Sequence, residues 1–208
     1  MGRNARAGGH RPYRVSPRWD GGALERHLAD TGYTHQQHGD PPTGTNSVLV
    51  ASRLPMSVKR LHTPHHRLVA VAIDGLSITG VYLPLRKRNV AFWISHFQPA
   101  LDELRAGLSV VIGDFNTGDD RDREARQPFF AEHLFKANVE GNWVDAWRAM
   151  HPERRESSCR SNRGNGFLID HVWLSQAVRE TLRSAIICHG IRDAGPSDHA
   201  ALTVDLAT

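Results

Sequence analysis

Cysteine is scarce in this chain, and long apolar runs are absent. The two cysteines, Cys159 and Cys188, lie far apart and without the spacing of a metal-ligand pair. They indicate neither a disulfide framework nor a zinc knuckle, and a reducing compartment such as the cytoplasm is expected. No stretch reaches the roughly 20 apolar residues that cross a bilayer, and no apolar signal core follows Met1. We therefore expect a cytoplasmic protein without a membrane partner.

Neither sign of charge dominates the sequence. Its 208 residues include 26 Lys and Arg against 22 Asp and Glu, a formal net charge of +4, which mildly favours contact with polyanions. With 39% hydrophobic residues, the chain is long enough for one sizeable core. Residues 1–15 are rich in Arg and Gly and lack apolar periodicity, so we expect a flexible basic arm there and a single domain over 16–208.

Strand patterns outnumber helix patterns along this domain. A helix is expected from a cap at Ser16-Pro17 to a stop at Gly32, and another over 90–104, where four large apolar residues share one face. Asp74-Gly75 separates two β-rich runs and predicts a hairpin. Strands are expected at 46–52, 67–73, 76–83, 108–112, 167–174, 185–188 and 201–206, and short helices at 129–134 and 144–150. Hairpins mixed with helical crossovers predict an α/β sandwich.

Polar residues follow the most apolar of these strands. Asp114 and Asn116, in Gly113-Asp114-Phe115-Asn116, come directly after it. Two residues apart in an extended chain, their side chains point the same way and can address one substrate. Viewed alone, an Asx turn that ends the strand is the commoner explanation. The segment becomes informative only together with others.

Two further segments place acids beside imidazoles. Asp198-His199 precedes the last strand, where an acid and an imidazole can bind a metal or a phosphoryl oxygen and move a proton; a polar loop is the simpler alternative. Strand alternation puts Asp170 on an apolar face, where an unpaired carboxylate is costly. Asp170 should therefore have a partner, and a histidine is the obvious one. Tyr82 closes the second hairpin strand, where a tyrosine most often simply packs.

The order of these segments resembles the endonuclease/exonuclease/phosphatase superfamily, which includes exonuclease III and the apurinic-site endonucleases. The resemblance runs over roughly residues 20 to 206 and rests on the following segments: Tyr82-x-Pro84, Gly113-Asp114-Phe115-Asn116, Ile169-Asp170-His171 and Ser197-Asp198-His199. It implies an α/β, four-layer sandwich of two mostly antiparallel or mixed β-sheets flanked by helices, with the site at one edge between the sheets. It also implies hydrolysis of phosphate esters.

The resemblance implies a role for each matching residue. Asp114 resembles the acid that orients and deprotonates water, and Asn116 the carboxamide that holds the phosphate. His199 resembles the donor to the scissile phosphate, and Asp170 the carboxylate that fixes its tautomer. Asp198 resembles a metal-site acid, and Tyr82 a phenol near the phosphate. Because these ligands are oxygens, Mg²⁺ or Mn²⁺ is the implied cofactor, with Asp114 and Asp198 as metal ligands.

The sequence departs from the family pattern near its start. The family has a strand ending in Gln-Glu upstream of the first helix, and that glutamate is the principal metal ligand. Here the first glutamate is Glu25, inside the expected helix. The chain is therefore expected to be N-terminally shortened, without the N-terminal strands, and to be a weak enzyme or none.

The leading hypothesis is a divalent-metal-dependent phosphodiesterase acting on nucleic acid, with DNA as partner and DNA repair as its setting. It would act as an exonuclease or at abasic sites. Arg86 and Arg88 are the expected phosphate-backbone contacts, although a charged loop beside a helix is as often a solvated face. The alternatives are an impaired remnant that binds nucleic acid without cutting it, and a phosphatase of the same superfamily acting on small phosphoesters.

Overall fold

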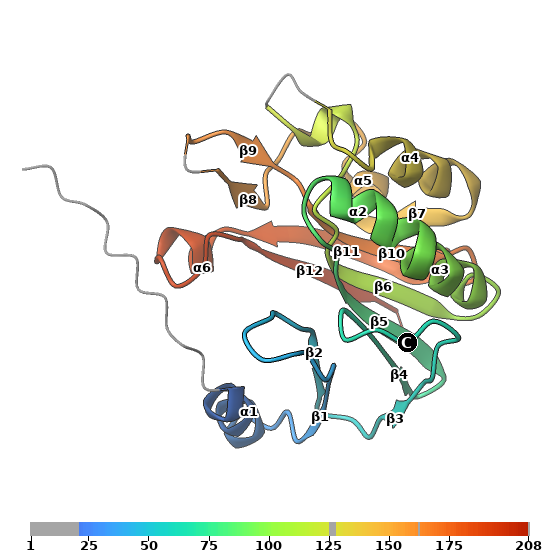
Figure 1. The fold of residues 1–208 in the computed structure, drawn as a ribbon, viewed down its shortest axis with the longest axis vertical. Coiled ribbons are helices and arrows are strands. Elements are labelled where there is room, and N and C mark those ends of the chain that lie inside the picture. Colours follow the sequence, from blue (N-terminus) through green and yellow to red (C-terminus); the bar gives the residue numbers. More distant parts are fainter. Residues whose placement is uncertain (1–20, 125–127, 162, 208) are drawn as a thin grey trace, which may run out of the picture.

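A six-stranded mixed sheet forms the centre of the computed structural model, which describes residues 21–124, 128–161 and 163–207 (Figure 1). Its strand order is β3-β4-β5-β6-β10-β7. The strands span Ser57–Val58 (β3), Leu68–Ile73 (β4), Leu76–Tyr82 (β5), Ser109–Asp114 (β6), Asp170–Ser175 (β10) and Trp143–Asp145 (β7). β5 and β6 run parallel, and the other neighbours run antiparallel.

A helical layer covers one face of this sheet. The parallel β5–β6 pair needs a crossover, which α2 (Lys87–Phe92), the π-helix η1 (Trp93–Phe97) and α3 (Gln98–Leu104) provide as one continuous helical segment. The predicted apolar face is confirmed, since Trp93, Phe97, Leu101 and Leu104 are each at most 1% exposed. They pack with Trp173 of β10, and α4 (Glu132–Gly141) adds Phe135 to the same cluster.

Two separate hairpins cover the opposite face. β11 (Leu182–Cys188) pairs with β12 (Ala201–Leu206), and β1 (His35–His38) pairs with β2 (Leu49–Ser52). The first hairpin and α5 (Ala146–Met150) bury Leu168, Val172 and Leu174. The second hairpin approaches β5 so closely that a Cβ at Gly80 would lie 2.5 Å from Val48 Cγ1. Helix α1 (Gly21–Asp30) lies beside β1, with Gln36 Nε2 donating to the Glu25 carbonyl at 2.8 Å.

The expected α/β architecture of two packed β-layers flanked by helices is thus confirmed, with the second layer built from two hairpins. The remaining short elements are η2 (Asp120–Asp122), β8 (Cys159–Arg160), β9 (Gly166–Phe167), η3 (Arg179–Thr181) and α6 (Gly190–Asp193). None of the described helices is long and apolar enough to cross a membrane.

Most of the predicted elements are present, and several differ in their bounds. The hairpin at Asp74-Gly75 is confirmed, with φ of 48° and 81° at the turn. The helix expected over 129–134 is instead α4, which begins at Glu132. The segment 144–150 was expected to be one helix, but its first residues pair with β10 before α5 begins. The cap at Ser16-Pro17 and the arm at 1–15 lie outside the described residues.

Candidate active site

Asp114 is fixed at the end of β6 by the backbone on either side of it. Gly113 has a φ of 145°, and a Cβ there would lie 2.0 Å from the Val81 carbonyl oxygen, so only glycine allows this approach. The Asp114 carboxylate accepts from the Asn116 backbone N–H at 2.8 Å and from Asn116 Nδ2 at 3.1 Å. Asn116 Nδ2 also donates to the Leu83 carbonyl at 2.7 Å. The Asx turn and the paired polar side chains are therefore both present.

Strand register places three of the predicted site residues side by side. Tyr82 on β5 pairs with Asp114 on β6, and Asp114 pairs with Asp170 on β10. Directly opposed residues on neighbouring strands present their side chains to the same face. Tyr82, Asp114 and Asp170 thus form a row across the sheet, which we call the strand-end row. Residues far apart in the sequence meet there because a parallel and an antiparallel pair share the strand β6.

The fourth segment reaches the row through a histidine. His199 Nδ1 lies 2.8 Å from Asp170 Oδ2, so the predicted pairing of Asp170 with a histidine is confirmed. The Ser197 hydroxyl accepts from the His199 backbone N–H at 3.0 Å, and the Asp170 N–H donates to Ser158 Oγ at 3.1 Å. Because Asp170 holds Nδ1–H, the ring presents Nε2 as its second polar atom.

The pKa values of Asp114 and His199 differ sharply from those of free side chains. Burial raises the pKa of Asp114 to about 7, and the neighbouring Asp170 carboxylate contributes. The hydrogen bond to Asp170 raises the pKa of His199 to about 11, with Cys159 adding to the effect. At neutral pH the site therefore contains an imidazolium donor beside a carboxyl group that can take up or release a proton.

The candidate metal ligands do not all lie together, unlike the residues of the strand-end row. Asp198 is exposed and shares a cluster with His199 and Cys159, while Asp114 is not part of it. Glu25 lies elsewhere, with Oε1 4.0 Å from His38 Nε2 beside the β1–β2 hairpin. Burial and the neighbouring Asp170 carboxylate disfavour the ionised form of Asp114, and a divalent cation held by one or two carboxylates together with a substrate phosphate, the usual way of binding Mg²⁺, would offset that charge.

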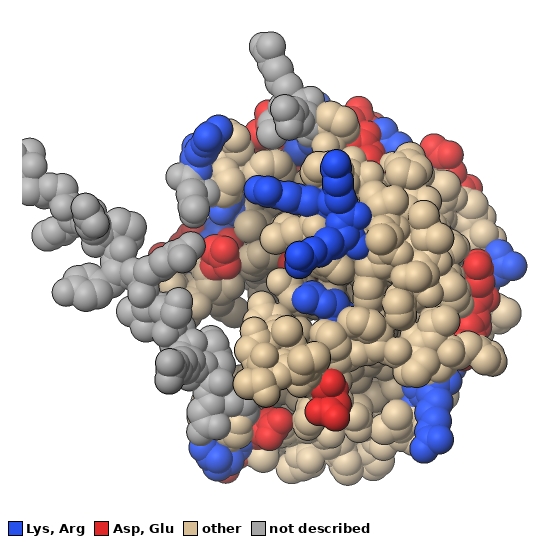
Figure 2. Space-filling view, viewed as in Figure 1, with Lys and Arg blue, Asp and Glu red and all other residues tan. Residues whose placement is uncertain are grey.

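A basic surface adjoins the strand-end row. The hollow here is lined by Arg67, Tyr82, Pro84, Leu85, Arg86, Lys87, Arg88 and Phe130. Figure 2 shows Lys and Arg side chains gathered on this face, where α2 begins. The Arg67 guanidinium carbon lies 4.7 Å from the centre of the Tyr82 ring. Tyr82 belongs both to this hollow and to the row, so an anion in the hollow would lie beside the site residues. Arg67 was not predicted, because its proximity arises only from the β4–β5 pairing.

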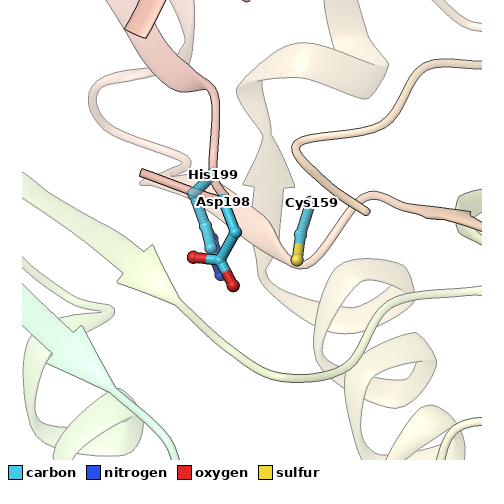
Figure 3. A group of neighbouring side chains, drawn as sticks. All are labelled: Cys159, Asp198 and His199. Atoms are coloured by element: carbon cyan, nitrogen blue, oxygen red, sulfur yellow. The ribbon is translucent and has the colours of Figure 1, made fainter. Parts of the chain in front are cut away.

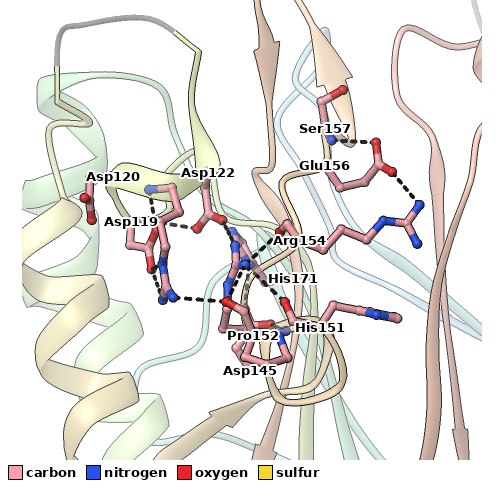
Figure 4. Close-up of polar contacts among 12 residues, drawn as sticks. Asp119, Asp120, Asp122, Asp145, His151, Pro152, Arg154, Glu156, Ser157 and His171 are labelled. Carbon is pink, nitrogen blue, oxygen red and sulfur yellow. Dashed lines mark hydrogen bonds and ion pairs between the residues drawn. The ribbon is translucent and has the colours of Figure 1, made fainter.

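A buried ionic cluster, which was not predicted from the sequence, lies behind the row (Figure 4). His171 Nδ1 lies 2.7 Å from Asp145 Oδ2, and its Nε2 lies 3.0 Å from the Thr117 carbonyl oxygen. Both partners only accept, so both ring nitrogens must carry hydrogen and the ring is an imidazolium. Arg148 Nη2 donates to Asp122 Oδ1 at 2.7 Å in the same cluster. These bonds tie the segment after Asn116 to β10 and β7, and so support the row.

Stability should depend on pH through this pair. Burial opposes the His171 charge, but the hydrogen bond to Asp145 outweighs it and raises the pKa from 6.5 to about 9. This stabilisation is complete below pH 6.5 and is lost as the pH rises through about 9. The same hydrogen bond outweighs burial and lowers the pKa of Asp145 below 3.8, so its contribution is present above pH 3.8 and falls only in stronger acid. Urea unfolding should show declining stability between about pH 6.5 and pH 9.

A matched variant isolates this effect from other groups that titrate in the same range. His171→Gln has no titrating ring, so its free energy of unfolding should decline less steeply over that interval than that of the wild type. Equal slopes in the two proteins would mean that His171 binds no extra proton in the folded state.

Solved structures of known proteins share this arrangement of elements. An AP endonuclease from Archaeoglobus fulgidus has a TM-score of 0.78 and 20% identity, and the similarity covers 88% of this chain and 83% of that chain. A 3'-5' exonuclease, NExo from Neisseria meningitidis, has a TM-score of 0.75 and 22% identity over the same shares. The 3' phosphatase NExo from Neisseria, bound to a product DNA hairpin, has a TM-score of 0.74 at 20% identity, again with 88% and 83% coverage.

No protein-family model and no curated protein sequence matches the chain. The chain is therefore similar to known proteins in structure, and at sequence identities of 20–22% this similarity shows a shared fold. The chain has the fold of this AP endonuclease and this exonuclease, the fold implied by its resemblance to the endonuclease/exonuclease/phosphatase superfamily.

Proposed function

We propose that this protein is a divalent-metal-dependent phosphodiester hydrolase that acts on nucleic acid, as an exonuclease or at abasic sites. The observation that carries the proposal is the strand-end row, in which Asp114 lies between Tyr82 and Asp170 while His199 is held by Asp170. An acid that can take up a proton and a cationic donor on one surface are what attack on a phosphate ester requires.

Each side chain has a specific task in this mechanism. Asp114 orients the attacking water and accepts its proton, while Asn116 holds the Asp114 carboxylate. To contact the phosphate, Asn116 would turn the amide hydrogen that it now donates to the Leu83 carbonyl. His199 donates from Nε2–H to a phosphoryl oxygen and offsets the charge that develops there. Asp170 keeps the imidazole in this orientation. Tyr82 lies next to Asp114 in the row, where its hydroxyl would contact the phosphate.

Asp114 and Asp198 would hold Mg²⁺ or Mn²⁺ together with the substrate phosphate. When bound, the ion would supply positive charge to the phosphate oxygens and favour ionisation of water. The positive charge of His199 would act on the same oxygens independently of the ion. The described residues provide few carboxylates for this role, so we expect the bound phosphate to contribute to ion affinity.

DNA is the proposed substrate because the basic hollow continues from the row. Phosphates bound by Arg86 and Arg88 would extend a backbone whose scissile group lies at Asp114. A fluorescent duplex with one abasic site, titrated with Mg²⁺, tests the proposal. Because Glu25 lies beside His38 and away from the site, we expect slow cleavage that rises to saturation with Mg²⁺ and is abolished by a chelator. Tight binding without cleavage would instead favour a nucleic-acid-binding protein, and preferential hydrolysis of inositol phosphates would favour a phosphatase.

Salt should weaken DNA binding in proportion to the number of phosphate contacts. Affinity for a duplex should fall steeply between about 50 and 200 mM salt, because each contact releases condensed counterions. When the logarithm of the binding constant is plotted against the logarithm of the salt concentration, Arg86→Ala and Arg88→Ala should each make the negative slope shallower by about 0.9. Arg179→Ala, which removes an exposed arginine beside Glu180, provides the control and should leave the slope unchanged. An identical slope in all four proteins would exclude the hollow as the DNA contact.

A further inference from the structure

A thiol lies beside the imidazole of the proposed active site. Cys159 on β8 forms an isolated β-bridge with His199, which brings together residues 40 positions apart in the sequence. One ligand atom each of Cys159, Asp198 and His199 lies within 4.8 Å of the others. Figure 3 shows the three side chains pointing toward the same space. None of these contacts follows from the role of His199 toward phosphate.

We propose that Cys159, Asp198 and His199 form a binding site for a borderline or soft divalent cation such as Zn²⁺, which shares Asp198 with the proposed Mg²⁺ site but differs from it in its other ligands. A thiolate, an imidazole nitrogen and a carboxylate are the three ligand types that Zn²⁺ takes in proteins. Hard cations such as Mg²⁺ prefer oxygen ligands, so Cys159 shifts the preference of this cluster away from Mg²⁺.

The geometry needs little adjustment. Zinc bonds of about 2.0–2.3 Å in a tetrahedron place neighbouring ligand atoms about 3.3–3.8 Å apart. The ligand atoms now lie within 4.8 Å of one another, so they would have to approach by roughly an ångström to bind zinc. Asp198 is exposed and Cys159 is partly exposed, so both side chains can make this movement. Three protein ligands leave a fourth position for water.

Asp170 supports the proposed zinc site by holding the histidine ligand. It engages His199 Nδ1 at 2.8 Å, so Nε2 is the ring nitrogen that would bind the metal, in exchange for its proton. A carboxylate that accepts the second ring N–H is the usual support of a zinc-bound histidine, because it fixes the ring and increases the basicity of the ligating nitrogen. The same contact that would orient His199 toward phosphate thus also prepares it for zinc.

Occupation by Zn²⁺ has a consequence for the reaction. A metal on Nε2 takes the lone pair that would otherwise carry a hydrogen, so His199 could no longer donate to the phosphate. Zn²⁺ would then inhibit the hydrolase by a route that Mg²⁺ does not share. This consequence rests on the proposed function, whereas the binding of the metal does not.

Cobalt provides a direct test, because Co²⁺ replaces Zn²⁺ and absorbs strongly in the near ultraviolet when a thiolate is a ligand. Titration of the full chain with Co²⁺ should produce this thiolate band with saturation at one equivalent, and Zn²⁺ should then abolish it. Cys159→Ser should eliminate the band. Cys188→Ser, the matched control at the exposed second cysteine, should retain it. Absence of a thiolate band in the wild type, or its persistence in Cys159→Ser, would overturn the proposal.

A second measurement uses the wild-type chain and so avoids any effect of substitution on folding. The rate at which iodoacetamide alkylates Cys159, followed by peptide mass spectrometry, should fall at least about tenfold with Zn²⁺, because a thiolate bound to metal is a poorer nucleophile. Mg²⁺ should not protect Cys159, and Cys188 should react equally under all conditions. Equal protection of both cysteines, or none at Cys159, would count against the site. Since both measurements report binding alone, they stand or fall independently of DNA cleavage.

Discussion

Asp114→Asn is expected to lower the rate of phosphodiester hydrolysis by about 100-fold or more while the fold remains intact. Asparagine keeps the shape of the side chain, but it cannot accept a proton from water. Its amide would also face the Asn116 N–H groups that the carboxylate now accepts. The measurement is single-turnover cleavage of the abasic-site duplex with saturating Mg²⁺, with circular dichroism to check the fold.

Asp102→Asn is the matched control for this substitution. Asp102 is an exposed aspartate on α3 that lies 3.8 Å from Arg105 Nη1 and accepts from Gln98 Nε2 at 3.3 Å, and an asparagine oxygen can still accept there, so this substitution should change neither rate nor fold. His199→Ala should cause a reduction similar to that of Asp114→Asn, since the charge on the phosphate would lose its donor. Wild-type rates in both Asp114→Asn and His199→Ala would remove these residues from the mechanism.

Asp145→Ala is expected to cost about 3–5 kcal/mol of unfolding free energy, because it leaves a buried charged ring without its partner. Asp145 also accepts from the Arg148 backbone N–H at 2.9 Å and so caps α5. Urea unfolding near neutral pH measures the loss. Asp145→Asn should cost less, since its amide can donate to a neutral His171 whose Nε2–H still reaches Thr117.

The comparison of these two variants distinguishes a charge effect from a simple loss of volume. Asp102→Ala, at an exposed helical position, should stay within about 0.5 kcal/mol of the wild type. If Asp145→Ala were as stable as Asp102→Ala, the buried pair would not hold the cluster together.

The elements that could be predicted from sequence are those whose pattern is local. The hairpin at Asp74-Gly75 and the apolar face of residues 90–104 depend on turn chemistry and helical period, and both are confirmed. Strand β1 could not be predicted, because His35–His38 contains no apolar residue and is held by pairing with β2. The bounds of α4 were not predicted either; Ala131 and Phe135 pack in the same apolar cluster as Trp173, a contact that no local pattern reveals.

In the candidate site, too, local patterns could be predicted from the sequence and tertiary contacts could not. Asp170 could be assigned a histidine partner because an unpaired carboxylate on an apolar strand face is costly, and His199 is that partner. Cys159 and Arg67 could not be found this way, since their positions depend on a β-bridge and on strand register. His171 stands next to Asp170 in the sequence, yet its partner Asp145 lies on another strand. The roles of the site residues in hydrolysis stay predictions.

The Asp170–His199 contact joins the two β-layers, since Asp170 belongs to the central sheet and His199 precedes β12 of the outer hairpin. Local opening of that hairpin would separate His199 from Asp170 without unfolding the central sheet. Such an opening would cost less free energy than global unfolding. Under the proposed function, molecules in which β11–β12 has opened would lack the oriented His199 and would not hydrolyse the substrate. Amide hydrogen exchange along these two strands would measure the free energy of this opening.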